Sequence, residues 1–218
     1  SPPSAGRHPP AIGSRLPAAM KQTHRPDLFS WSRYHEPQDI DFNSLALQRP
    51  GGQVLIDPLP MSEHDLGHLK WLGPVSWIIV TNSDHLRAAP DLAKALGAKV
   101  AGPAAEKATF PYPCDRWLSD GEEAAPGLLV RELNGSKTPG ELALVLEETT
   151  LITGDVVRSH QPTSLRWLPP PKLKDPLAAV ASVKRLVSLH PEIRAVLVGD
   201  GFCFYENVGP HLGRLLDA

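Results

Sequence analysis

Four short apolar segments of this sequence end in acidic or polar residues. They are QVLID (residues 53–57), WIIVT followed by NSDH (residues 77–85), LITGD (residues 151–155) and AVLVGD (residues 195–200). Such segments are typical of buried strands, and in an open α/β sheet the ends of neighbouring strands meet at one edge, where ligands bind. One strand-end carboxylate alone is more often a helix cap or a turn residue. Four of them, one beside a histidine, favour a ligand site.

The rest of the pattern predicts the elements that would position these strand ends. Two apolar runs are joined by Pro50-Gly51-Gly52, which suits a hairpin turn. Amphipathic spacing predicts helices, and the first of them starts at a Ser62 cap. The expected strands are residues 43–49, 53–57, 75–81, 98–102, 128–133, 142–147, 151–153 and 193–198, and the expected helices are residues 62–72, 85–96, 176–190 and 206–216.

Both halves of the sequence combine antiparallel-looking strand pairs with helices. Because apolar strand faces need covering on both sides, this order predicts an α/β protein with two mixed sheets packed together and helices outside, a four-layer αββα sandwich. The alternative, a doubly wound parallel sheet, needs a helix between most strands, and the three close strands within residues 128–153 argue against it. We expect one domain over residues 27–218. Residues 1–26, rich in Pro, Gly and Ser, are expected to form a flexible extended arm.

The composition excludes several functional classes. The formal charge is −2, from 22 Lys and Arg against 24 Asp and Glu, so no basic field is available to hold nucleic acid. No apolar run approaches the roughly 20 residues that span a bilayer, and the sequence shows no apolar signal core. The two cysteines form no C-x-x-C pair and are too few for a disulfide scaffold. We expect a cytoplasmic protein whose partner is a small molecule, with no nucleic acid or membrane.

The order of the segments resembles the metallo-β-lactamase-fold hydrolase superfamily over residues 29–216. The matching pieces are VLIDP (54–58), IIVTNSDH (78–85), SKTPGELALVL (136–146), LITGDV (151–156) and AVLVGDG (195–201). In that family the second piece is T-H-x-H-x-D-H, a histidine stands beside T-P-G in the third, the fourth supplies a bridging aspartate, and the last is G-H-G. The resemblance implies the αββα fold, with Asp84, His85 and Asp155 as recognisable family ligands.

The sequence departs from the family pattern at nearly every histidine. Residues 81–85 keep the terminal Asp-His but lack both earlier histidines, and Asp200 stands at the centre of the family's G-H-G. The histidine beside T-P-G corresponds to Lys137 or Glu141, depending on the register. Because the missing residues would hold the first metal, the resemblance implies that the usual two-zinc site does not form. Whether one metal binds is left open.

One interpretation is a mononuclear metal-dependent hydrolase of a small ester or phosphoester. One divalent ion per chain, Zn, Fe or Mn, would suit this set of carboxylates and one imidazole, and it would lower the pKa of bound water. Asp84 and Asp200 are the catalytic candidates in this interpretation. The expected metal ligands are Asp84, His85, Asp155 and Asp200, and the expected substrate-binding residues are Asn82, Arg87, Lys137 and His160.

The alternative is a metal-free pseudoenzyme of the same fold that binds a ligand or a protein. The aspartates would then be helix caps or turn residues. Buried carboxylates without a metal repel one another, so they are expected to take up protons or to turn toward Lys137, Arg87 or backbone amides.

Overall fold

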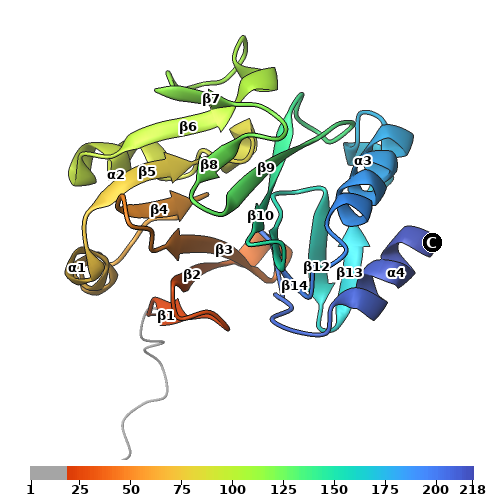
Figure 1. Cartoon of the computed structure of the whole chain (residues 1–218), viewed down its shortest axis with the longest axis horizontal. Helices are drawn as coiled ribbons and strands as arrows, with labels where there is room; N and C mark the ends of the chain where they lie inside the picture. Colours follow the sequence, from red (N-terminus) through yellow and green to blue (C-terminus); the bar gives the residue numbers. More distant parts are fainter. Residues whose placement is uncertain (1–18) are drawn as a thin grey trace, which may run out of the picture.

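Two large mixed β-sheets pack against each other in the structure, a computed structural model that describes residues 19–218 (Figure 1). The first sheet has the strand order β1-β2-β3-β4-β5-β6-β7 and the second has the order β14-β11-β10-β9-β8. Helices α1 and α2 lie outside the first sheet, and α3 and α4 lie on the opposite side of the molecule, outside the second (Figure 1). The predicted four-layer αββα sandwich is confirmed.

The first sheet is antiparallel from β1 to β4 and parallel from β4 to β7. Helix α1 joins β4 to β5 and α2 joins β5 to β6, so both cover the same face, as two right-handed crossovers do. The bounds are β1 (Lys21–Gln22), β2 (Leu28–His35), β3 (Ile40–Leu47), β4 (Gln53–Ile56), α1 (Glu63–Leu72), β5 (Val75–Ile79), α2 (Ala89–Leu96), β6 (Lys99–Pro103) and β7 (Arg116–Leu118).

The second sheet is antiparallel except where β11 pairs with β14. A separate antiparallel hairpin, β12 with β13, packs beside α4. The bounds are β8 (Glu123–Ala125), β9 (Leu128–Leu133), β10 (Glu141–Leu146), β11 (Thr150–Ile152), β12 (Val157–Gln161), β13 (Ser164–Trp167), α3 (Pro176–Leu189), β14 (Ala195–Leu197) and α4 (Gly209–Asp217).

Strand β10 shows why the chain needs four layers. All six of its residues are buried. Leu142, Leu144 and Leu146 belong to the apolar cluster between the two sheets, whereas Ala143 and Val145 belong to the cluster under α3 and α4. Because successive side chains of a strand point to opposite faces, a strand with apolar residues on both faces is stable only with a layer on each side.

Several predicted elements agree with the structure, but two predicted helices start later than expected: α2, and α4, which begins at Gly209 and not at residue 206. The Ser62 cap is present, with Ser62 Oγ accepting from the Asp65 amide at 3.1 Å. Residues 85–96 were predicted to be one helix. Instead a 3-10 turn, η2 (Ser83–His85), precedes α2, and Arg87 between them has φ 46°. A left-handed residue cannot continue a helix, so α2 begins afresh at Ala89, with Pro90 in its first turn.

The N-terminal arm ends earlier than the sequence pattern predicts. Met20 is 4% exposed, and its amide donates to Asp65 Oδ1 at 2.8 Å. Lys21–Gln22 forms β1, which pairs with β2. The boundary at residue 26 is therefore wrong, because a buried side chain and a strand ladder fix the chain from residue 20 onward. Residues 1–18 of the predicted arm lie outside the described residues.

Residues 28–35 form β2, which the sequence pattern does not predict. The short strands β7 and β8 and the hairpin β12–β13 are also absent from the predicted elements. Cys114 and Cys203 are both free thiols. Within residues 19–218, no helix combines the length and the apolar composition that a bilayer span requires.

The inter-sheet layer should dominate the stability of the fold. Leu144 is fully buried in that layer, so Leu144→Ala should lower the free energy of unfolding by about 2–5 kcal/mol through lost burial and a cavity. Leu189→Ala is the control, since Leu189 is 47% exposed at the end of α3; its effect should stay within about 0.5 kcal/mol. Urea unfolding followed by circular dichroism measures both. Equal losses for the two variants would contradict this account of the core.

Candidate functional site

The polar strand ends meet at one edge of the sandwich, as predicted. Asp57 follows β4 and residues 81–85 follow β5 in the first sheet, whereas Asp155 follows β11 and Asp200 follows β14 in the second. Within the described residues, His85, Asp155 and Asp200 each place a potential ligand atom within 4.8 Å of the others. The two sheets therefore contribute to the same site, and the predicted convergence is confirmed for these three residues.

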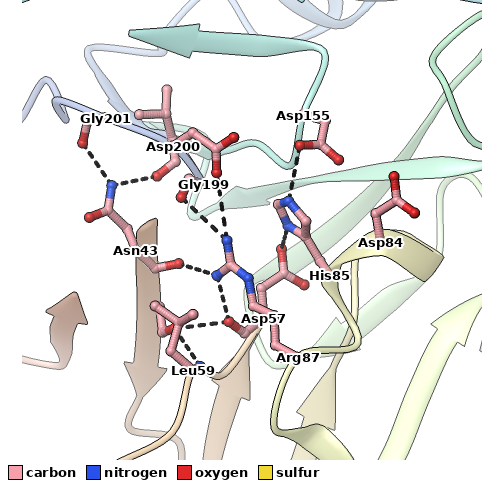
Figure 2. A network of polar contacts seen from close by, with 12 residues as sticks. Asn43, Asp57, Leu59, Asp84, His85, Arg87, Asp155, Gly199, Asp200 and Gly201 are labelled. Carbon is pink, nitrogen blue, oxygen red and sulfur yellow. Dashed lines mark hydrogen bonds and ion pairs between the residues drawn. The ribbon is translucent and has the colours of Figure 1, made fainter. Parts of the chain in front are cut away.

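His85 is the centre of this site, and a carboxylate contacts each of its ring nitrogens. Nδ1 lies 2.7 Å from Asp57 Oδ2, and Nε2 lies 3.1 Å from Asp155 Oδ1 (Figure 2). Burial by itself would lower the pKa of His85, but the charges of Asp155 and Asp57 outweigh it and raise the pKa to about 10. His85 is therefore a buried imidazolium that donates one N–H to each sheet.

Asp57 is held in place by the residue that ends the neighbouring strand. Its Oδ1 accepts from the Thr81 amide at 2.8 Å, and its Oδ2 accepts from the Thr81 hydroxyl at 2.6 Å. With the His85 N–H added, both oxygens of a 3% exposed carboxylate are occupied. Asp57 thus orients His85, in the way a carboxylate fixes the ring and tautomer of a neighbouring histidine.

The carboxyl groups of Asp155 and Glu141 lie close together in the buried region beside His85. Glu141 accepts from the Asp155 amide at 2.6 Å and from the Val156 amide at 3.0 Å. The Asn82 side-chain amide bridges the pair, donating to Glu141 Oε1 at 3.1 Å and to Asp155 Oδ2 at 3.2 Å. Burial, and next the charge of Asp155, raise the pKa of Glu141 to about 8.

Two glycines let these groups approach. A Cβ at Gly154 would lie 2.8 Å from Thr81 Oγ1 and 2.9 Å from both Asn82 Nδ2 and Glu141 Oε1. A Cβ at Gly199 would lie 2.8 Å from His85 Cε1. These separations are too short for contacts of a Cβ atom with another heavy atom. The glycine before each strand-end aspartate is therefore needed for the close contact between the sheets.

The ammonium group of Lys137 lies between two of the predicted metal ligands. Its Nζ is 2.9 Å from Asp84 Oδ2 and 3.2 Å from Asp155 Oδ2. Burial would raise the pKa of Asp155, but the nearby charges of His85 and Lys137 outweigh it and hold that pKa well below its usual range. Asp84 is not among the three residues whose potential ligand atoms lie close together. Its contact with the site is the ion pair with Lys137.

Arg87 forms the wall behind His85. Its guanidinium donates to the backbone carbonyls of Asn43 at 2.6 Å, Asp57 at 2.8 Å and Gly199 at 3.4 Å, and it lies 3.7 Å from Asp200 Oδ1 (Figure 2). The side chain is 8% exposed. Arg87 was expected to contact a substrate. In the structure its donors are instead used to tie the two sheets together.

The residues do not fit a divalent ion in their present arrangement. The separation of 4.8 Å or less among His85, Asp155 and Asp200 would permit one. However, both nitrogens of His85 already bind carboxylates, and Asp155 already binds Lys137. A metal ligand must be deprotonated, so an ion would have to remove the proton from His85 and displace the ammonium group.

The other predicted site residues have distinct positions. Asn82 is a predicted substrate-binding residue. In the structure its side-chain oxygen accepts from the Asp84 amide at 3.0 Å and so caps η2. The metal-free alternative predicts this capping role for Asp84 instead. His160 lies on β12, where burial and the charge of Arg158 lower its pKa, and the charge of nearby Asp200 opposes them. Its Nε2 is buried and has no hydrogen-bond partner within residues 19–218. Binding of substrate by His160 stays a prediction.

The sequence places Asp57 among the converging strand ends but indicates no role for it, and it gives no indication that Asn43 lies in the site. Asp57 carried a signal, because it ends QVLID as Asp155 ends LITGD. Glu141 appeared only as one of two candidates for the family's missing histidine. The structure shows why both registers were plausible: Lys137 and Glu141 both reach Asp155, one from the loop before β10 and the other from its first residue.

The site and the fold define an αββα protein in which one sandwich edge carries a carboxylate-rich cluster. A profile of the metallo-β-lactamase superfamily matches residues 20–218, and the chain therefore belongs to that superfamily. No sequence among the curated proteins matches it.

Solved structures show the same fold at low sequence identity. A metallo-β-lactamase from Pontibacter korlensis has a TM-score of 0.71 at 19% identity, covering 92% of this chain and 99% of that one. The metallo-β-lactamase FIM-1 from Pseudomonas aeruginosa, in a mono-zinc form, has a TM-score of 0.73 at 15% identity, covering 95% and 98%. A metallo-β-lactamase from Hirschia baltica has a TM-score of 0.71 at 15% identity, covering 92% and 98%.

The charge on His85 should be visible in the pH dependence of stability. Its folded pKa of about 10 lies above the ordinary 6.5, so the stabilisation is fully present below about pH 6.5 and is lost as pH rises toward 10. The stability difference between wild type and His85→Gln should shrink over that range, whereas His64→Gln, at an exposed histidine, should show no such change. Urea titrations across this range measure it. A constant difference would show that His85 is neutral in the folded protein.

Proposed function

We propose that this protein is a metal-independent, ligand-binding member of the metallo-β-lactamase superfamily. The observation that carries the proposal is the position of Lys137 Nζ, 2.9 Å from Asp84 Oδ2 and 3.2 Å from Asp155 Oδ2. These two carboxylates are the ones that the family resemblance assigns to a metal. A cation supplied by the chain itself takes the place that the ion would have between them.

The charges around the site support this proposal. Four aspartates, residues 57, 84, 155 and 200, are matched by three cations of the same chain, His85, Lys137 and Arg87. A divalent ion placed among them would meet three positive charges, and those of His85 and Arg87 are buried, where repulsion is stronger than in water. Asp57 and Asp155 also lose the sites that a metal would use, because hydrogen bonds and ion pairs occupy their oxygens.

A second candidate function is a mononuclear metal-dependent hydrolase. The close approach of ligand atoms from His85, Asp155 and Asp200 favours it, as does the mono-zinc form of one structural relative. It requires Lys137 to leave the carboxylates. The two candidates therefore differ in one measurable property, which is whether the protein with Lys137 intact takes up a metal ion.

Removing the Lys137 ammonium should open the site to metal. Chelator-treated wild-type protein titrated with Zn²⁺, Mn²⁺ or Fe²⁺ should give no binding heat. Lys137→Ala should bind one ion at least about tenfold more tightly, because Asp84 and Asp155 then lack a cation, and Lys137→Ala/His85→Ala should lose that gain. Isothermal titration calorimetry and metal analysis of the dialysed proteins measure this.

The matched control is Lys172→Ala, since Lys172 is an exposed lysine at the end of the 3-10 turn η4 (Pro170–Lys172) and forms no salt bridge among the described residues. It should behave as wild type. Stoichiometric metal in the wild-type protein, together with metal-dependent turnover of a generic ester or phosphodiester, would overturn the proposal in favour of the hydrolase.

A further inference from the structure

A cavity of about 250 Å³ lies between the two sheets, behind the wall that Arg87 forms. Asn43, Asp57 and Gly199, whose carbonyls bind Arg87, also line this cavity. The site described above and the cavity are therefore on opposite sides of the same three backbone segments. The cavity is only slightly smaller than the roughly 300 Å³ at which ordinary ligand pockets begin.

Small residues on both sheets create this cavity. On β2, Leu28, Ser30, Ser32 and Tyr34 share one face, because a strand alternates. Leu28 belongs to the inter-sheet apolar cluster, but the next two positions on that face are serines, and both line the cavity. The opposite wall has Thr153, glycines and Cys203 where larger side chains would fill the space. Protein cores are normally packed without such gaps.

Among residues 19–218, no free charge lines the cavity. Asp57 is the only carboxylate that these residues place in the lining, and Thr81 and His85 already occupy both of its oxygens. Burial raises the pKa of the Cys203 thiol to about 11 and of the Tyr205 phenol to about 12, so both stay neutral. A charged ligand would leave water without gaining an opposite charge, which costs free energy.

The lining combines apolar walls with neutral hydrogen-bonding groups. Leu45, Ile56, Ile152 and Leu197 supply apolar surface. The Ser32 hydroxyl donates to Asn43 Oδ1 at 2.7 Å, and the Asn43 amide donates to the Gly201 carbonyl at 2.8 Å (Figure 2). A serine hydroxyl that donates one bond can still accept others. Phe202 and Tyr205 also line the cavity and are 47% and 43% exposed, so aromatic side chains stand where the cavity reaches solvent.

We propose that this cavity binds a neutral small molecule that has a compact apolar body and one hydroxyl group. The apolar body would lie against the leucine and isoleucine side chains, and the polar group would meet the serine hydroxyls of β2. The inference deepens the proposed ligand-binding function and rests on it for the assumption that the protein binds rather than hydrolyses its ligand. It depends on no metal ion.

The charge selectivity of wild-type protein tests the class of ligand. The probes are 2-phenylethanol, phenylacetate and 2-phenylethylammonium, which share a phenyl body and differ in charge. Ligand-detected and amide-shift NMR should show 2-phenylethanol binding at least about tenfold more tightly than either ion, with shifts at residues 30–32 and 201–205. No binding of 2-phenylethanol, or equal binding of all three probes, would overturn the proposal.

Filling the cavity tests the location. Ser30→Leu extends the apolar face of β2 into the empty volume, so it should raise the melting temperature, as cavity-filling substitutions do, and abolish 2-phenylethanol binding. Ser188→Leu adds the same side chain at an exposed position of α3 and should leave binding unchanged. Ser32→Val is a smaller second filling variant, expected to weaken binding. Full binding by folded Ser30→Leu and Ser32→Val would contradict the assigned location.

The same protein samples separate this inference from the proposed function. If wild-type protein holds no metal and binds no 2-phenylethanol, the cavity inference fails while the metal-independent function stands. If it holds stoichiometric metal and turns over an ester, the proposed function fails, whatever the probes do at the cavity.

Discussion

The buried carboxylates at one sandwich edge have to be neutralised, and three cations of the chain do so by bonding across the two sheets. His85, after β5, binds Asp155, after β11. Lys137, from the loop before β10, binds Asp84 beside His85. Arg87, before α2, binds the Gly199 carbonyl and approaches Asp200. Each contact joins the first sheet to the second. The same ion pairs and hydrogen bonds therefore neutralise the carboxylates and hold the two sheets together at this edge. An unpaired buried charge would cost several kcal/mol.

The two sides of this edge of the sandwich differ in solvent exposure and in charge. The Lys137 side is open to solvent, since Asp84 is 51% exposed and Lys137 31% exposed. The other side is the neutral cavity, which begins where Arg87 ties the carbonyls of Asn43 and Asp57 to the second sheet. The polar residues at the strand ends therefore serve mainly one another.

The fold could be predicted from the sequence because it depends on patterns that are local. Strand β10 is apolar from Leu142 to Leu146 and needs a covering layer on each face, and the three close strands of residues 128–153 argue against a doubly wound sheet. The start of α2 was not predictable in this way, because the turn at Arg87 depends on tertiary bonds of its guanidinium. Strand β2 was missed because the serines on its core-facing side, which leave room for the cavity, interrupt the apolar pattern.

The meeting of Asp155, Asp200 and His85 could likewise be predicted, because strand ends of a layered sheet converge. Their partners could not. Whether Lys137 or Glu141 takes the place of the missing histidine depends on side-chain reach across the sheets, and in the structure both contact Asp155. The possibility that the carboxylates turn toward Lys137 and Arg87 was foreseen as one alternative. The sequence also gives no indication that Asp57 is the carboxylate that contacts His85 Nδ1, on the side of the ring opposite Asp155.

A crystal structure of the wild-type protein grown with excess Zn²⁺, with data collected at the zinc absorption edge, tests the central claim most directly. The account predicts Lys137 Nζ between Asp84 and Asp155, and no anomalous peak near His85. A peak about 2.0–2.2 Å from His85 Nε2 and an Asp155 oxygen, with the Lys137 side chain displaced from both carboxylates, would contradict it.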